Sequence, residues 1–258
     1  MSTGRKQLTR RRFLLGAGTA AIGGAAAGWA LHERPDDRPV ALVYRGKASC
    51  SGCSEAVGRL LESAPDPFRV VYCGPDEDVE LTTEALAGAA VYAQPGGGEV
   101  RPAWRRMRSH AADIRAYVHG GGNYLGFCLG AYLAGTDPGF DLVPETVHRY
   151  LGTAGSEVQD TDDTVIEVNW RGERRHMFFQ DGPEFTGAWV TAPETTVLAR
   201  YRTGTAAAAV TSYGAGRVGL VGPHPESDES WYRGPGLTNP DGIRFDLGHD
   251  LVAATVAR

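Results

Sequence analysis

Four short runs of apolar residues, separated by helical or polar segments, constrain the fold most strongly. They are Val40–Tyr44, Phe68–Tyr72, Ala89–Ala93 and Tyr124–Phe127. A short run that is apolar on both faces is typical of a strand buried in a parallel sheet. Between the first two runs, Ser54–Leu61 places its apolar residues on one side and predicts a helix. Strands that alternate with helices predict an α/β fold with a mostly parallel sheet, joined by right-handed crossovers.

The second half of the chain predicts β-hairpins added to this sheet. Two pairs of predicted strands flank turns that contain glycine, and they are Val165–Trp170 with His176–Phe179 and Val197–Tyr201 with Ala206–Val210. Val218–Val221 predicts a further buried strand, and Phe245–Ala257 a helix at the end of the chain. No segment between residues 40 and 258 has the composition of a linker, so we expect one domain over that range.

The first thirty residues predict an export signal. Thr9–Leu15 (TRRRFLL) resembles the twin-arginine signal and runs into the apolar, alanine-rich segment Gly16–Ala30. This segment is shorter than the roughly 20 residues that a membrane-spanning helix needs. We therefore expect a signal peptide over residues 1–30, a linker over 31–39, and recognition by the twin-arginine export machinery. Cleavage after Ala27 or Ala30 and an uncleaved anchor are both left open.

This signal predicts that the protein works in the extracellular, cell-wall or periplasmic space, where disulfides persist. It would contact a membrane only through the signal segment, if that segment is not cleaved. The charge of the remaining chain argues against nucleic acid as a partner. The predicted signal contains five basic residues and no acidic one. Residues 31–258 therefore hold 21 basic residues against 31 acidic ones. Binding to nucleic acid depends on neutralising phosphates, for which this balance is unsuited.

Gly126-Phe127-Cys128-Leu129-Gly130 has the pattern of a nucleophile elbow with cysteine in place of serine. At such an elbow a strand turns sharply into a helix, so the residues two positions away on either side must lack side chains. A helix that begins at the elbow favours the thiolate of Cys128, since the peptide dipoles stabilise negative charge there. The alternative is a buried structural cysteine among small residues.

Two further segments are suited to act with such a nucleophile. Gln94–Gly98 (QPGGG) follows the third predicted strand, where bare amides can approach a substrate oxygen together with the N–H of Leu129. Near the end of the chain, Pro225 separates His224 from Glu226 and keeps the backbone extended, so both side chains can lie on one side. Glu226 would then orient His224, which would accept the proton of a thiol. A flexible turn and a solvated loop are the alternatives for these segments.

These motifs together resemble one known family. The segments that carry the resemblance are Tyr92–Gly98, Gly121–Gly135, Phe179–Pro183 and Gly222–Glu226. They are similar to the biotin-protein ligase N-terminal domain-like family, within the class I glutamine amidotransferase-like superfamily, over Val40–Glu226. The resemblance implies a flavodoxin-like three-layer sandwich with the site at the carboxyl ends of the strands, in agreement with the pattern of strands and helices.

The resemblance also implies roles for five residues of a Cys-His-Glu triad and its oxyanion hole. They are Cys128 as nucleophile, His224 as base, Glu226 as the residue that orients it, and Gly97 and Leu129 as oxyanion donors. Biotin ligation belongs to a separate domain that binds ATP and biotin, and Arg171–Arg175 (RGERR) is a poor match for its loop. We therefore expect hydrolysis of an amide, peptide or ester, a small-molecule or peptide substrate, and no cofactor. A binding module without turnover is the alternative function.

Three residues near these motifs are candidates to line a pocket or to pack beside it: Tyr132, Gln180 and Asp181. The remaining cysteines, Cys50, Cys53 and Cys73, are candidates for a disulfide. Because Cys73 ends the strand beside the one that precedes Cys50, we expect Cys73 to pair with either Cys50 or Cys53. A Cys-x-x-Cys sequence at the start of a helix is also found in thiol oxidoreductases, and this redox function stays open. Zinc lacks a fourth ligand, so no metal is expected.

Overall fold

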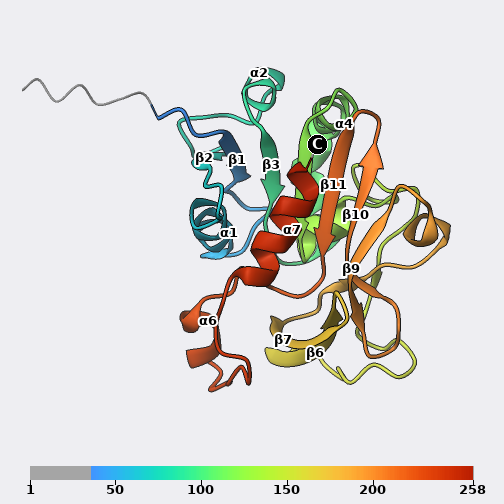
Figure 1. Ribbon diagram of the computed structural model, residues 1–258. Helices are drawn as coiled ribbons and strands as arrows, with labels where there is room; N and C mark the ends of the chain where they lie inside the picture. Colours follow the sequence, from blue (N-terminus) through green and yellow to red (C-terminus); the bar gives the residue numbers. More distant parts are fainter. Residues whose placement is uncertain (1–35, 258) are drawn as a thin grey trace, which may run out of the picture. The chain divides into compact units, whose positions relative to one another are not determined.

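A computed structural model describes residues 36–257 (Figure 1). The predicted signal, residues 1–30, and residues 31–35 of the predicted linker lie outside the described residues. Contacts divide the chain into Met1–Pro35 and Asp36–Arg258, so the described residues form one unit. No helix within this described part is long and apolar enough to span a membrane.

One nine-stranded sheet forms the centre of the unit. Its parallel half contains, in spatial order, β2 (Arg69–Cys73), β1 (Val40–Tyr44), β3 (Val91–Gln94), β4 (Asn123–Phe127) and β11 (Gly216–Val221). Its antiparallel half continues with β10 (Ala206–Tyr213), β9 (Thr196–Tyr201), β6 (Thr164–Trp170) and β7 (Glu173–Phe179). A separate two-stranded sheet pairs β5 (His148–Arg149) with β8 (Pro183–Glu184).

Helices cover both faces of the sheet. One face packs against α1 (Cys53–Glu62) and α7 (Asp246–Val256), and Figure 1 shows α7 crossing the near side of the strands. The other face packs against α2 (Thr83–Ala87), α3 (Val100–Met107), α4 (Ala111–His119) and α5 (Leu129–Leu133). Two short 3-10 helices, η1 (Arg108–His110) and η2 (Ala188–Thr191), and helix α6 (Glu229–Arg233) complete the described elements.

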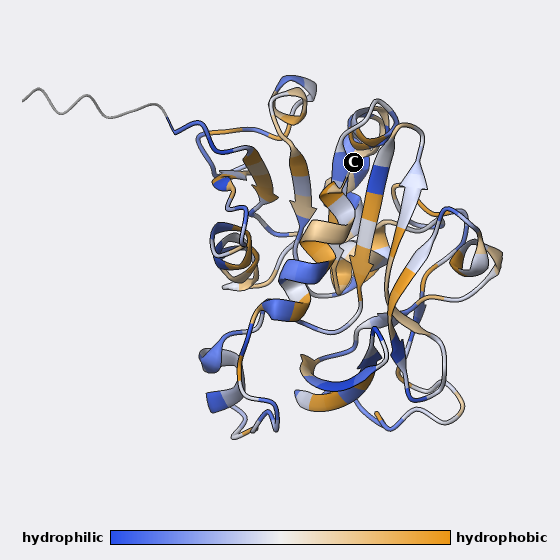
Figure 2. Cartoon of the chain, in the orientation of Figure 1, coloured by the Kyte–Doolittle hydropathy of each residue, from blue (hydrophilic) through white to orange (hydrophobic). Residues whose placement is uncertain are grey.

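This arrangement confirms the predicted α/β fold. The central strands are buried on both faces, and Figure 2 shows them as largely hydrophobic. Both predicted hairpins form, with turn residues at positive φ: 49° at Arg171, 92° at Gly172 and 90° at Gly204. The hairpin strands continue the parallel strands in a single sheet, because residues 208–213 of β10 pair with all of β11.

The predicted pairing of Cys73 is wrong. The disulfide joins Cys50 to Cys53, and Cys73 is a free, buried thiol. Successive side chains of a strand point to opposite faces of the sheet. Cys73 packs with Tyr44 and Leu86 on the face covered by α2, whereas α1, which begins at Cys53, packs on the other face. Adjacent strand ends therefore do not bring the two sulfur atoms together.

Candidate active site

The backbone turns sharply at Cys128, between β4 and α5. Cys128 has φ 46° and ψ −103°, a conformation that costs free energy in any residue with a side chain. Its N–H donates to the carbonyl of Val221 at 2.9 Å, and its own carbonyl accepts from the N–H of Ala131 at 2.9 Å. A Cβ at Gly126 would lie 2.7 Å from the carbonyl oxygen of Gly130, which explains why the first glycine of the elbow is required.

The structure brings His224 to the same edge of the sheet. Strands β4 and β11 are parallel neighbours whose last residues, Phe127 and Val221, lie opposite each other, so the segments that follow them meet. The N–H of His224 donates to the carbonyl of Phe178 at 2.9 Å, which fixes its backbone. Nδ1 of His224 lies 2.8 Å from Oε1 of Glu226, as the sequence predicted.

The three groups of this site are removed from solvent. Cys128 is 5% exposed, His224 4% and Glu226 0%. The second carboxylate oxygen of Glu226, Oε2, has no hydrogen-bond partner among the described residues. Burial by itself lowers the pKa of His224, but the negative charges of Glu226 and Cys128 outweigh this effect and raise the pKa to about 10. The surroundings of His224 therefore favour the protonated form of its ring.

Gly96 shows how close the thiol and the imidazole lie. A Cβ added at Gly96 would be 3.0 Å from Cε1 of His224 and 3.7 Å from Cβ of Cys128. The same point is 3.6 Å from Sγ of Cys53. The sulfur of Cys128 donates to the carbonyl of Gln180 at 3.7 Å. Glycine at position 96 thus leaves room for three reactive side chains around one point.

The two predicted oxyanion donors are neighbours. A Cβ at Gly97 would lie 2.5 Å from Cδ2 of Leu129, and 3.2 Å from Cα of Ser49 on its other side. Within residues 36–257, neither the N–H of Gly97 nor that of Leu129 donates to another protein group. An oxyanion hole beside Cys128 would need backbone donors that are free in this way.

The predicted pocket residues lie beside the elbow. Tyr132 is half-buried and donates its hydroxyl to the carbonyl of Asp181 at 3.0 Å, and burial raises its pKa, so it stays a neutral donor. The carboxylate of Asp181 accepts two hydrogen bonds from Arg149, at 2.7 and 2.5 Å. The side chain of Gln180 is exposed, and only its carbonyl reaches the thiol.

Three residues that lie at or beside this site were not identified from the sequence. Gly96 lies within the predicted glycine loop, but nothing in the sequence distinguishes it from the glycine that follows. Arg149 pairs with Asp181 across two segments far apart in the chain. Trp231 packs its ring 5.0 Å from that of His224. Such contacts depend on tertiary arrangement, although the position of Trp231 shortly after the His-Pro-Glu segment was an available signal.

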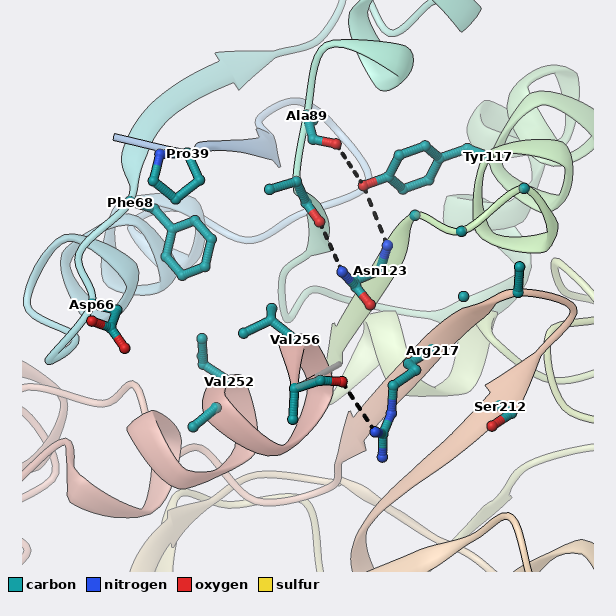
Figure 3. Close-up of a pocket in the computed structure, with 18 of the residues that line it drawn as sticks. Pro39, Asp66, Phe68, Ala89, Tyr117, Asn123, Ser212, Arg217, Val252 and Val256 are labelled. Carbon is teal, nitrogen blue, oxygen red and sulfur yellow. Dashed lines mark hydrogen bonds between the residues drawn. The ribbon is translucent and has the colours of Figure 1, made fainter. Parts of the chain in front are cut away.

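A cavity of about 1050 Å³ lies elsewhere, at the amino ends of the parallel strands (Figure 3). It is lined by Asn123 and Arg217, near the starts of β4 and β11, whereas Cys128 and His224 follow the ends of those strands. The side-chain amide of Asn123 donates to the carbonyl of Ala90 at 3.0 Å, so one of its donors is already used within the protein. The part of the chain that the structure describes holds no cluster of His, Cys, Asp and Glu side chains arranged for a metal.

Residues 40–148 match the family described as biotin-protein ligase, N terminal. This segment contains the elbow at Cys128 and the glycine loop that begins at Gln94, while His224 and Glu226 lie beyond it. A search of curated proteins gave no match. The match covers the part of the chain in which the first four strands and the nucleophile elbow were predicted.

Solved structures show the same fold. A crystal structure described as glutamine amidotransferase is similar with a TM-score of 0.53 and 18% identity, covering 77% of this chain and 99% of its own. The structure of PurLQS from Thermotoga maritima is similar with a TM-score of 0.57 and 16% identity, covering 85% of this chain and 98% of its own. The fold is therefore glutamine amidotransferase-like. Together with the family match, this finding supports the superfamily that the sequence resembles.

The packing of the elbow predicts the effect of adding one methyl group. In Gly126→Ala the new Cβ would overlap the backbone at Gly130, which cannot move without disturbing α5. We expect the variant to lose about 1–3 kcal/mol of stability, measured by urea unfolding. Gly98→Ala is the matched control, because a Cβ there would meet no atom within 4 Å. Equal stability of the two variants would show that the elbow is not packed as described.

The pKa of His224 predicts a dependence of stability on pH. It rises from 6.5 for a free imidazole to about 10 in the folded protein, so the folded state keeps a proton that the unfolded chain releases. This contribution is fully present below pH 6.5 and is lost as the pH rises through about 10. We expect the free energy of unfolding to fall between pH 7 and 10. In His224→Gln the free energy of unfolding should fall by at least about 1 kcal/mol less over this pH range than in the wild type. An equal fall in the wild type and the variant would contradict the pairing of His224 with Glu226.

Proposed function

We propose that the protein is a cysteine-nucleophile hydrolase that acts on an amide, peptide or ester carbonyl. The observation that carries the proposal is the burial of a thiol, an imidazole and a carboxylate at one edge of the sheet, with Nδ1 of His224 bonded to Glu226. That bond leaves Nε2 as the ring atom able to exchange a proton with Cys128. The glutamine amidotransferase-like fold is consistent with amidase-type chemistry.

The proposed reaction has two steps. Cys128 attacks the carbonyl carbon, and the imidazolium of His224 gives its proton to the departing amine or alcohol, which leaves a thioester. Water then attacks the thioester while His224 accepts its proton, and the carboxylic acid departs as Cys128 is released. Glu226 holds the ring in position and stabilises its charge, because it is buried against the ring and accepts from Nδ1.

The proposed oxyanion hole uses the N–H groups of Gly97 and Leu129. In both steps negative charge develops on the substrate oxygen, and donors already held in place stabilise that charge without reorganising. The side chain of Leu129 and the backbone of Ser49 occupy the space where a Cβ at position 97 would lie, so this part of the loop is closely packed. Tyr132, Asp181 and its partner Arg149 lie next to the elbow and are the groups proposed to contact the rest of the substrate.

We also propose export by the twin-arginine route as the setting of this activity. The support is the sequence Thr9–Leu15, the apolar segment Gly16–Ala30, and a disulfide between Cys50 and Cys53, a bond that persists outside the cytoplasm. In that space water is the abundant acceptor for a thioester. Hydrolysis is accordingly favoured over transfer of ammonia to a second substrate.

A screen of chromogenic esters, anilides and peptide amides tests the hydrolase proposal. We expect release of product together with a mass increase on Cys128 that equals the acyl group, seen after acid quenching. Cys128→Ser should abolish both signals, and His224→Ala should lower kcat/KM by roughly 10²–10⁴-fold, the usual contribution of general acid–base catalysis. Cys73→Ser is the control for loss of a thiol, since Cys73 lies on the other side of β2 from α1 and should retain activity.

Absence of both product and an acyl adduct on Cys128 with every substrate class would contradict turnover. In that case a small-molecule ligand that protects Cys128 from alkylation would identify the protein as a binding module on the same fold.

A further inference from the structure

The disulfide between Cys50 and Cys53 lies next to the proposed nucleophile. A Cβ added at Gly96 would be 3.6 Å from Sγ of Cys53 and 3.7 Å from Cβ of Cys128. Gly96 has no side chain, so this space is left to the side chains of Cys53 and Cys128 and to the ring of His224, whose Cε1 would be 3.0 Å from the same point. The structure thus places a disulfide and a free thiol around one point, although strands β2, β3 and β4 lie between Cys53 and Cys128 in the sequence.

The two sulfurs of the disulfide differ in their surroundings. Cys53 is 1% exposed and begins α1, with its side chain turned toward Gly96, whereas Cys50 is exposed. In thiol–disulfide exchange the sulfur that leaves departs as a thiolate, which water stabilises. Cys50 is therefore the better leaving group, and Cys53 is the sulfur that faces a thiol within the protein.

The loop that carries the disulfide also contacts the loop of the proposed oxyanion hole. The N–H of Cys50 donates to the carbonyl of Gly96 at 3.0 Å. The side chain of Gln94 donates to the carbonyl of Ala48 at 3.1 Å, and both groups are buried. A change in the pairing of Cys50 and Cys53 would therefore act directly on the backbone that lines the site.

From this juxtaposition we propose that Cys128 exchanges with the Cys50–Cys53 disulfide, forming a Cys53–Cys128 disulfide that closes the active site reversibly. Sγ of Cys128 attacks Sγ of Cys53, the Cys50–Cys53 bond breaks, and its electron pair remains on the sulfur of Cys50, which takes a proton from water. The step consumes no oxidant and no reductant. Attack of the Cys50 thiolate on Cys53 runs the step in reverse and frees Cys128.

This inference rests on the proposed function in one respect, because both use Cys128 as the nucleophile. Its consequence is a second form of the protein in which the nucleophile is masked, and a masked thiol is protected from irreversible oxidation. Cys73 cannot take part, because it packs on the other face of the sheet and burial raises its pKa to about 12.

Mass spectrometry of the full chain tests the proposal. The protein is incubated near pH 8 with a maleimide that carries a bulky polyethylene glycol chain, which captures exposed Cys50 once it is released. It is then quenched in acid and digested without reductant. We expect a Cys53–Cys128 linked peptide to accumulate together with modified Cys50, and dithiothreitol to remove the link. Cys73→Ser, a control outside the site, should give the same peptides in the same amounts.

The variant Cys50→Ser shows separately whether the sulfur atoms of Cys53 and Cys128 can form a bond. This variant cannot form the resting disulfide, and after mild oxidation with diamide we expect a Cys53–Cys128 link and at least a tenfold loss of alkylation at Cys128, restored by dithiothreitol. Absence of the linked peptide from the wild-type chain overturns the exchange. Failure of the proposed function has a different signature, in which the linked peptide forms but no substrate acylates Cys128.

Discussion

Parallel pairing of β4 with β11 is the constraint on which the rest of the structure depends. Phe127 and Val221 end these strands side by side, so the next residues of both segments enter the same space. The hydrogen bond from the N–H of Cys128 to the carbonyl of Val221 continues this pairing into the elbow. Two parts of the chain that are almost a hundred residues apart are thereby brought into one site.

Burial then determines the chemistry of that site. A carboxylate, an imidazole and a thiol taken out of water are costly unless their charges compensate one another. Here the pKa of His224 is raised against the effect of burial, because its ring lies between Glu226 and Cys128. The strained backbone at Cys128 contributes to the same site, because the sharp turn places the thiol near the ring of His224. The glycines at positions 126 and 130 leave room for that turn.

Much of this could be predicted from the sequence, because the signals are local. Apolar runs identified the parallel strands, and the turn at Arg171 and Gly172 identified a hairpin. The elbow at Cys128 and the spacing of His224 and Glu226 identified the groups that the fold brings together. The cysteine pairing was not predictable in this way, because adjacency of strand ends does not say which face of the sheet a side chain occupies. The place of Gly96 among three reactive side chains likewise depends on tertiary packing alone.

The central claim is that Cys128 and His224 form one reactive pair. Site-resolved alkylation by iodoacetamide at pH 7 tests it most directly, with rates measured for each cysteine by mass spectrometry. The account predicts that Cys128 is alkylated before Cys73, and that His224→Ala slows its reaction on the order of tenfold, since a thiol without a partner is only slightly ionised at this pH. Equal rates at Cys128 in the wild type and the variant would contradict the account.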